Sequence, residues 1–276
     1  MEFKDQSELY FQRMDSAVDQ KAELLRWITG PAVAELGPGS GSLTELIADR
    51  LEIETVLALD ASSDAVAKLS ERFEANPSVD FDTTVLGEHP APFGGRHFNS
   101  IVASSVFHEV YSFLGRPALE LIESQVLKAL VPGGRFILRD GVQPDGHELP
   151  ARMTVSERLL GLAQRYCTEG REDLRPTIDG NVVSGTRHQV AELAFTITWG
   201  GLSFDREVEE QYQLYELQEA TRFYEDFGLE LIHAETYTQE GYIEHLADSP
   251  METVNDRGDW EPWFPVTNAL WVFEKL

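Results

Sequence analysis

The chain has 276 residues, enough for one sizeable α/β domain with an insertion, and its 42% hydrophobic and 10% aromatic content is typical of a folded, well-cored protein. The formal net charge of −26 disfavours nucleic acid as a partner, because such a surface repels phosphate groups. A single cysteine, Cys167, excludes an internal disulfide and a cysteine-based zinc site.

The first predicted elements are one or two amphipathic helices over residues 5–28, which end at a Gly-Pro pair. A buried strand over 32–36 follows, and after a glycine turn a helix begins at Ser42. The next buried strand, over 55–59, ends at Asp60, and a serine at position 62 or 63 caps the helix behind it.

Three further strands are predicted over 79–86, 98–104 and 135–140. A strong helix over 116–131, with proline in its first turn, ends at Pro-Gly-Gly before the last of these strands. Because strands that are apolar throughout alternate with helices, we expect a mostly parallel sheet covered on both faces.

Two helical patterns, over 151–167 and 186–199, interrupt this order and predict a helical insertion. A helix over 206–227 and two more strands then restore it. With no repeat and no low-complexity linker, the sequence favours one domain over 1–276. Its predicted parts are a helical cover (1–29), a ligand-binding half (30–140), the insertion as a cap (141–205) and the C-terminal part of the sheet (206–276).

The stretch AELGPGSG (34–41) places glycine at alternate positions directly after the first strand. Such a turn lets the backbone approach a ligand closely, next to the N–H groups that begin the following helix. A dinucleotide fingerprint requires G-x-G-x-x-G, and here position 42 is serine, which favours a ligand without a pyrophosphate. Asp60, at the end of the second strand, is placed to accept hydrogen bonds from ribose hydroxyls.

These residues together resemble class I S-adenosylmethionine-dependent methyltransferases: AELGPGSG is similar to motif I, LALDAS (57–62) to the ribose-binding segment, and LKALVPGGRFILRD (127–140) to the segment entering strand five. The resemblance implies a three-layer Rossmann-like α/β fold whose seven-stranded sheet has an antiparallel last strand. It also implies S-adenosyl-L-methionine as cofactor and S-adenosyl-L-homocysteine as product. The cofactor-binding residues that it implies are Glu35, Gly37, Gly39, Gly41, Asp60, Ala61, Leu86 and Ser104.

In this family the segment after strand four, here ASSVFHEVYSF (103–113), lies next to the transferred methyl group. His108 is the residue there best suited to remove a proton, with Glu109 orienting it or facing solvent. Substrate contact without proton transfer and a purely structural role for His108 both stay open. Acidic residues and a histidine in RDGVQPDGHE (139–148) suggest a magnesium-dependent alternative, although the segment after strand four lacks an aspartate to complete such a site, so we expect no metal.

We expect a methyl group to pass to oxygen or nitrogen of a small, partly apolar metabolite in a lidded pocket. The aromatic residues of the insertion and the C-terminal loop either line that pocket or form an ordinary core; they are Tyr166, Phe195, Trp199, Trp260, Trp263 and Phe264. Alternatives are methylation of a peptide, a protein or an RNA end, and a non-methylating cofactor-binding protein. The first ten residues lack a signal-peptide pattern and no apolar run could span a membrane, so we expect a cytoplasmic protein without a membrane partner. Monomer and homodimer both stay open.

Overall fold

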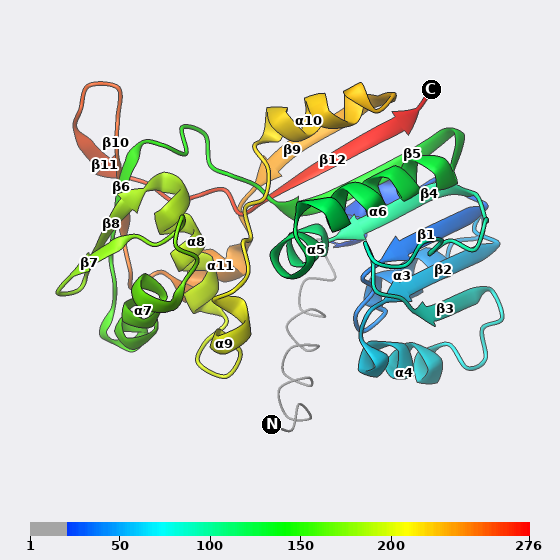
Figure 1. Ribbon diagram of the computed structural model, residues 1–276, viewed down its shortest axis with the longest axis horizontal. Coiled ribbons are helices and arrows are strands. Elements are labelled where there is room, and N and C mark those ends of the chain that lie inside the picture. The colour runs from blue at the N-terminus through cyan, green and yellow to red at the C-terminus, as the bar shows by residue number, and fades with distance from the viewer. Residues whose placement is uncertain (1–20) are drawn as a thin grey trace. The chain divides into compact units, whose positions relative to one another are not determined.

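The alternating strands and helices form a seven-stranded sheet in the computed structural model, which describes residues 21–276 (Figure 1). The strand order is β3-β2-β1-β4-β5-β12-β9, and strands β1 to β5 pair in parallel. Figure 1 shows β12 running in the opposite direction to β4, so the mostly parallel, Rossmann-like sheet with an antiparallel last strand is confirmed. The strands are β1 (Ala32–Leu36), β2 (Thr55–Asp60), β3 (Val79–Thr83), β4 (Phe98–Ser104), β5 (Leu130–Gly141), β9 (Leu229–Tyr237) and β12 (Asn268–Lys275).

Side-chain hydrogen bonds define the ends of two helices that pack on this sheet. Ser62 accepts a hydrogen bond from the Ala65 amide and so caps α4. The end of α6 is held by the Lys275 ammonium, which donates to the carbonyls of Leu127 (2.7 Å) and Leu130 (2.8 Å) and thereby ties β12 to that helix. The elements are η1 (Glu23–Trp27), α3 (Ser42–Ala48), α4 (Ser63–Arg72), α5 (Phe107–Leu114), α6 (Arg116–Ala129) and α10 (Leu217–Asp226).

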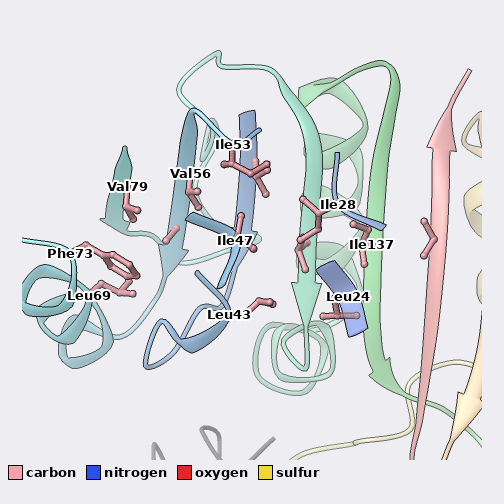
Figure 2. Close-up of a cluster of buried hydrophobic side chains, with 14 of the residues drawn as sticks. Leu24, Ile28, Leu43, Ile47, Ile53, Val56, Leu69, Phe73, Val79 and Ile137 are labelled. Carbon is pink, nitrogen blue, oxygen red and sulfur yellow. The ribbon is translucent and has the colours of Figure 1, made fainter. Parts of the chain in front are cut away.

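A continuous apolar core covers one face of the sheet (Figure 2). Strand residues such as Val56 and Ile137 meet Leu43 and Ile47 of α3 and Leu69 of α4 there. Burial of an aliphatic side chain contributes ~1.5–3 kcal/mol, so this layer fixes the helices against the sheet. The carboxyl ends of β1, β2, β4 and β5, which the layer supports, all lie along one edge.

The described residues divide into two compact units. The first comprises 21–140, 221–234 and 270–276, and the second comprises 141–220 and 235–269. The predicted N-terminal helices lie mostly outside the described residues, and only η1 represents them. Within the described part of the chain, no helix combines the length and the apolar character needed to cross a lipid bilayer.

The prediction of a purely helical insertion was wrong, because the second unit contains an antiparallel sheet of order β11-β10-β6-β8-β7. The pattern over 151–167 is in fact a strand followed by a helix. Ala151 and Met153, two residues apart, point into the core, which is the periodicity of a strand. The elements are β6 (Pro150–Thr154), α7 (Glu157–Glu169), β7 (Thr177–Asp179), β8 (Val182–Thr186), α8 (Arg187–Thr198), α9 (Phe204–Glu207), α11 (Glu240–His245), β10 (Met251–Val254) and β11 (Trp260–Pro262).

The predicted continuous helix over 206–227 is also corrected, since α9 ends at Glu207 and α10 begins at Leu217. Between them the chain is mostly buried and is not helical. The carboxylate of Glu192, itself fully buried, accepts the amides of Tyr212 (3.0 Å) and Gln213 (2.6 Å). A side chain from α8 therefore satisfies backbone groups that a helix would otherwise pair internally.

Candidate active site

The glycine turn after β1 has the tight conformation that the sequence predicts. Gly37, Gly39 and Gly41 have φ angles of 67°, 58° and 81°, in the left-handed region that favours glycine. The Gly37 amide donates to the carbonyl of Leu59 on β2 (2.9 Å), and the Gly41 amide closes the turn on Pro38 (3.0 Å). The turn is therefore fixed to the second strand.

Neighbouring atoms also leave no room for a side chain at the first glycine of this turn. A Cβ atom on Gly37 would lie 2.8 Å from Val106 Cγ2 and 2.9 Å from Val106 Cβ. Val106 precedes α5, so the turn after β1 touches the turn after β4. The side chain of Arg72, at the end of α4, donates to the Ser40 carbonyl (2.7 Å) and pairs with Glu45 (2.9 Å), bracing the turn from the other side.

Asp60 connects the two predicted ligand-binding segments. It ends β2 with its side chain half-buried. One carboxylate oxygen accepts the Gly39 amide (3.0 Å), and the other accepts the Ser62 amide (2.8 Å). The carboxylate of Asp60 therefore links the glycine turn to the residues that follow β2.

Glu35, the acid of the β1 segment, lies buried behind the turn with only 3% of its surface exposed. Burial raises its pKa from the ordinary 4.5 to about 7. The Thr44 hydroxyl, which donates to Glu35 at 2.6 Å, and the charge of Lys21 both lower this pKa, while Asp60 raises it further. A buried acid that titrates near neutrality is suited to receive a cationic group from a ligand.

The remaining predicted cofactor residues occupy the same edge in sequence order. Ala61 follows β2 and is exposed, whereas Leu86 is buried three residues beyond β3. Ser104 ends β4, is 8% exposed, and accepts a long hydrogen bond from Arg139 (3.4 Å). Ala61 and Leu86 carry no polar side-chain atom, so only their backbones and apolar surfaces can contact a ligand.

The segment after β4 forms a helix that the sequence analysis does not predict: α5 begins at Phe107, and His108 is in its first turn. Glu109 was expected either to orient His108 or to face solvent; it is half-exposed, and Asp140 contacts the His108 ring. Its Oδ1 atom lies 2.6 Å from His108 Nδ1, with Asp140 fully buried and His108 6% exposed. Sequence reasoning considered Asp140 only as a metal ligand and missed this pairing across 32 residues.

The acidic segment considered for a metal is arranged differently from a metal site. His147 contacts Glu148 (3.3 Å) and Glu216 (3.2 Å) through its two ring nitrogens, and Asp140 is engaged with α5. Over residues 21–276, no group of three or more histidine, cysteine or acidic side chains is arranged to hold a metal ion.

The aromatic residues of the second unit belong largely to its core. Tyr166 and Phe195 are each 1% exposed, and Trp199, Trp263 and Phe264 pack against the same buried clusters. Trp260 is the exception, since it is 42% exposed on β11 with the Arg152 guanidinium 4.3 Å from its ring centroid. Of the two interpretations left open by the sequence, the structure favours an ordinary core for most of this set.

Comparison with known proteins finds similarity over the part of the chain that includes the glycine turn and Asp60. Residues 34–136 match the family model described as a methyltransferase domain. Ribosomal RNA small subunit methyltransferase A of Erwinia tasmaniensis is 27% identical over 152 residues, which is 50% of this chain. The match covers 48% of that protein, so the chain spans about half the length of the curated relative it matches.

Two solved structures resemble the whole fold. A candidate methyltransferase from Bacillus halodurans C-125 gives a TM-score of 0.53 at 13% identity, covering 94% of this chain and 99% of that one. A candidate methyltransferase of Haloferax volcanii, solved in complex with the activator Trm112, gives a TM-score of 0.53 at 11% identity, covering 98% and 93%. At such identities these likenesses concern the fold alone.

The seven-stranded sheet and the glycine turn define a Rossmann-like α/β fold. Within this fold, residues 34–136 are similar to a methyltransferase domain.

Proposed function

We propose that this protein is a methyltransferase (EC 2.1.1 type) that transfers a methyl group from S-adenosylmethionine to an oxygen or nitrogen atom of a small, partly apolar metabolite. The observation that carries the proposal is the carboxylate of Asp60, which accepts the Gly39 amide at 3.0 Å and so joins the glycine turn to the end of β2. That arrangement suits one ligand with a polar tail at the turn and a sugar at Asp60.

In this proposal the residues of the turn and its neighbours hold the cofactor. Glu35 receives its ammonium group, and Gly37, Gly39 and Gly41 surround its amino-acid portion. Asp60 accepts the ribose hydroxyls, while Ala61, Leu86 and Ser104 contact the rest of the nucleoside. The cofactor supplies an electrophilic methyl group on a sulfonium, so the chain's task is to position an acceptor in line with it.

His108 is the proposed general base. It lies in the first turn of α5, the helix that follows the carboxyl end of β4. Val106, the N-cap residue of that helix, lies next to Gly37 of the glycine turn. A neutral imidazole ring carries a lone pair that can accept a proton, which is the property a general base needs. Glu109, half-exposed one residue further along α5, is proposed as an accessory acidic residue.

The acceptor class rests on charge. A net charge of −26 opposes binding of RNA, although the Erwinia tasmaniensis relative is named as a ribosomal RNA methyltransferase and supports an RNA substrate as the alternative. We propose further that both units belong to one methyltransferase domain. The second unit is inserted in the chain after β5 of the sheet, which makes it the variable part suited to acceptor choice.

Calorimetry tests the proposal. S-adenosylhomocysteine is titrated into the wild-type protein and into Asp60→Ala, with the exposed Asp82→Asn on β3 as control. Loss of hydrogen bonds from two ribose hydroxyls to a charged acceptor is expected to weaken binding about 10- to 100-fold in Asp60→Ala. Asp82→Asn is expected to bind like the wild type. Absence of heat with S-adenosylhomocysteine, together with a clear signal from NADH, would contradict the proposal.

Substrate class is tested separately. The protein is incubated with S-adenosylmethionine and either a metabolite panel or structured RNA, and S-adenosylhomocysteine formation is followed. Turnover on small molecules supports the proposal, and turnover on RNA alone supports the alternative. Tight cofactor binding with no turnover on any acceptor would favour a non-methylating binding protein.

A further inference from the structure

One carboxylate at the end of β5 organises the whole start of α5. The Oδ2 atom of Asp140 accepts the backbone amides of Phe107 (2.9 Å) and His108 (3.3 Å). Its Oδ1 atom lies 2.6 Å from Nδ1 of the His108 ring. Val106, the N-cap residue, has no side chain able to cap this helix, so Asp140 supplies the cap from another strand.

The hydrogen bonds of Asp140 favour one ring nitrogen as the carrier of the hydrogen. Its Oδ2 atom accepts two backbone amides, as an ionised carboxylate does, and an ionised carboxylate only accepts hydrogen bonds, so we assign Nδ1 of His108 as the donor in the 2.6 Å contact. In the neutral ring the lone pair is then on Nε2. Because Asp140 is fully buried, its hydrogen bonds to the amides and the ring are not weakened by competition with water.

The turn before α5 is held just as firmly by the preceding residue of β5. The Arg139 guanidinium donates to Ser105 Oγ (2.7 Å), and the Ser105 amide donates back to the Arg139 carbonyl (2.7 Å). Ser105 has a φ of 57°, a conformation that non-glycine residues rarely adopt. Such strain persists only where the surroundings determine it, and it concentrates at functional sites. Two consecutive β5 residues therefore fix the position of His108.

We propose that Asp140 is a positioning residue that fixes the tautomer of His108, and that the enzyme's acceptor is accordingly a group that must lose a proton, such as a hydroxyl. The inference rests on the proposed function and narrows its oxygen and nitrogen acceptors to those that carry a proton. A base held this way contributes nothing to methylation of a thioether or a tertiary amine, which have no proton to lose.

With a hydroxyl acceptor, the oxygen forms a bond to the methyl carbon while the carbon–sulfur bond of S-adenosylmethionine breaks. The electron pair of the broken bond remains on sulfur, so the sulfonium becomes the neutral thioether of S-adenosylhomocysteine. The hydroxyl proton passes to Nε2 of His108, and the imidazolium is stabilised by the Asp140 carboxylate at Nδ1. Release of that proton to solvent restores the base.

The first test reads the tautomer directly. Protein labelled with 15N-histidine is compared by long-range 1H–15N NMR in the wild type, His108→Gln and Asp140→Asn, with His108→Gln assigning the signals. In wild type, Nδ1 of His108 is expected to carry the hydrogen. In Asp140→Asn the side-chain oxygen can still accept the Phe107 amide, while its NH₂ group faces the ring, so the tautomer is expected to reverse. An Nε2–H tautomer in wild type, or no change in Asp140→Asn, would overturn the inference.

The second test measures turnover with phenol, catechol and 2-phenylethanol against thioanisole and pyridine. Wild-type protein is expected to turn over the hydroxyl acceptors. The turnover rate is expected to fall about 100-fold or more in both Asp140→Asn and His108→Gln and to stay unchanged in Asp82→Asn. His108→Gln keeps the Asp140 cap on α5, so it separates lost catalysis from lost folding. No turnover on any hydroxyl acceptor, or full turnover in the variants, would overturn the assigned class. Unchanged S-adenosylhomocysteine affinity in these variants shows that the cofactor proposal stands independently.

Discussion

The side chain of Glu35 is 3% exposed and accepts a hydrogen bond from Thr44. Its burial lowers the stability of the folded protein at a pH where the free carboxyl group would be ionised. Its pKa is raised from 4.5 to about 7, chiefly by burial, so the folded protein binds a proton that the unfolded chain releases between those pH values. For an acid with a raised folded-state pKa, stability decreases as pH rises through this window and is level above it.

The corresponding prediction compares wild type with Glu35→Gln, which stays neutral at every pH. Between pH 4.5 and 7 the unfolding free energy of wild type is expected to fall by about 3 kcal/mol relative to the variant, since each pH unit is worth ~1.4 kcal/mol. Urea titrations at half-unit pH intervals measure it. A constant difference between the two proteins across this range would show that Glu35 is ionised normally.

The site residues that the sequence predicts lie next to predicted strands, whereas the partner of His108 is distant from it in the chain. The glycines and Asp60 could be predicted because the glycine turn directly follows β1 and Asp60 ends β2, and parallel strands bring such ends to one edge. The partner of His108 could not, because Asp140 is 32 residues away and Glu109 is adjacent. Only the pairing of β4 with β5, Ser104 opposite Arg139, places Asp140 beside the start of α5.

At the scale of elements, the strands of the second unit show where periodicity fails. β6 and β8 have five residues each, with two buried positions in β6 and one in β8, before a longer helix begins. So few alternations do not distinguish a strand from the first turn of a helix. The break between α9 and α10 was invisible for another reason: it depends on the Glu192 carboxylate, a tertiary contact.

Contact between the turn after β1 and the turn before α5 gives an element-scale prediction. Gly37→Ala is expected to lower stability by ~2–3 kcal/mol and to reduce S-adenosylhomocysteine affinity, because its Cβ would overlap the stiff Val106 side chain. Gly133→Ala is the matched control: its φ of 74° is similarly left-handed, but nothing lies within 4 Å of the added atom. It should cost only ~1–2 kcal/mol and leave affinity intact. Equal effects of both variants would show that the Val106 contact is unimportant.

At the scale of the whole molecule, charge dominates. A net charge of −26 on 276 residues makes the folded state self-repelling, because folding brings the carboxylates closer together than in the extended chain. The ion pairs of the described residues are mostly at the surface, such as Arg116 with Glu120 (3.1 Å), and such pairs contribute ~0–1 kcal/mol each. Repulsion is therefore the larger electrostatic effect on stability.

Salt is accordingly expected to stabilise the protein. Raising KCl from 0.1 to 1 M shortens the screening length from about 10 to 3 Å, which weakens repulsion between distant charges more than contacts within ion pairs. We expect the unfolding free energy to rise by ~1–3 kcal/mol over this range.

Replacing Glu219, Glu225 and Asp226 of α10 with their amides removes three negative charges, so this variant should be more stable than wild type at 0.1 M KCl and respond less to salt. Urea unfolding at several KCl concentrations measures both effects, with sucrose as a control for ion-independent stabilisation. Destabilisation of wild type by KCl would mean that ion pairs outweigh the net charge.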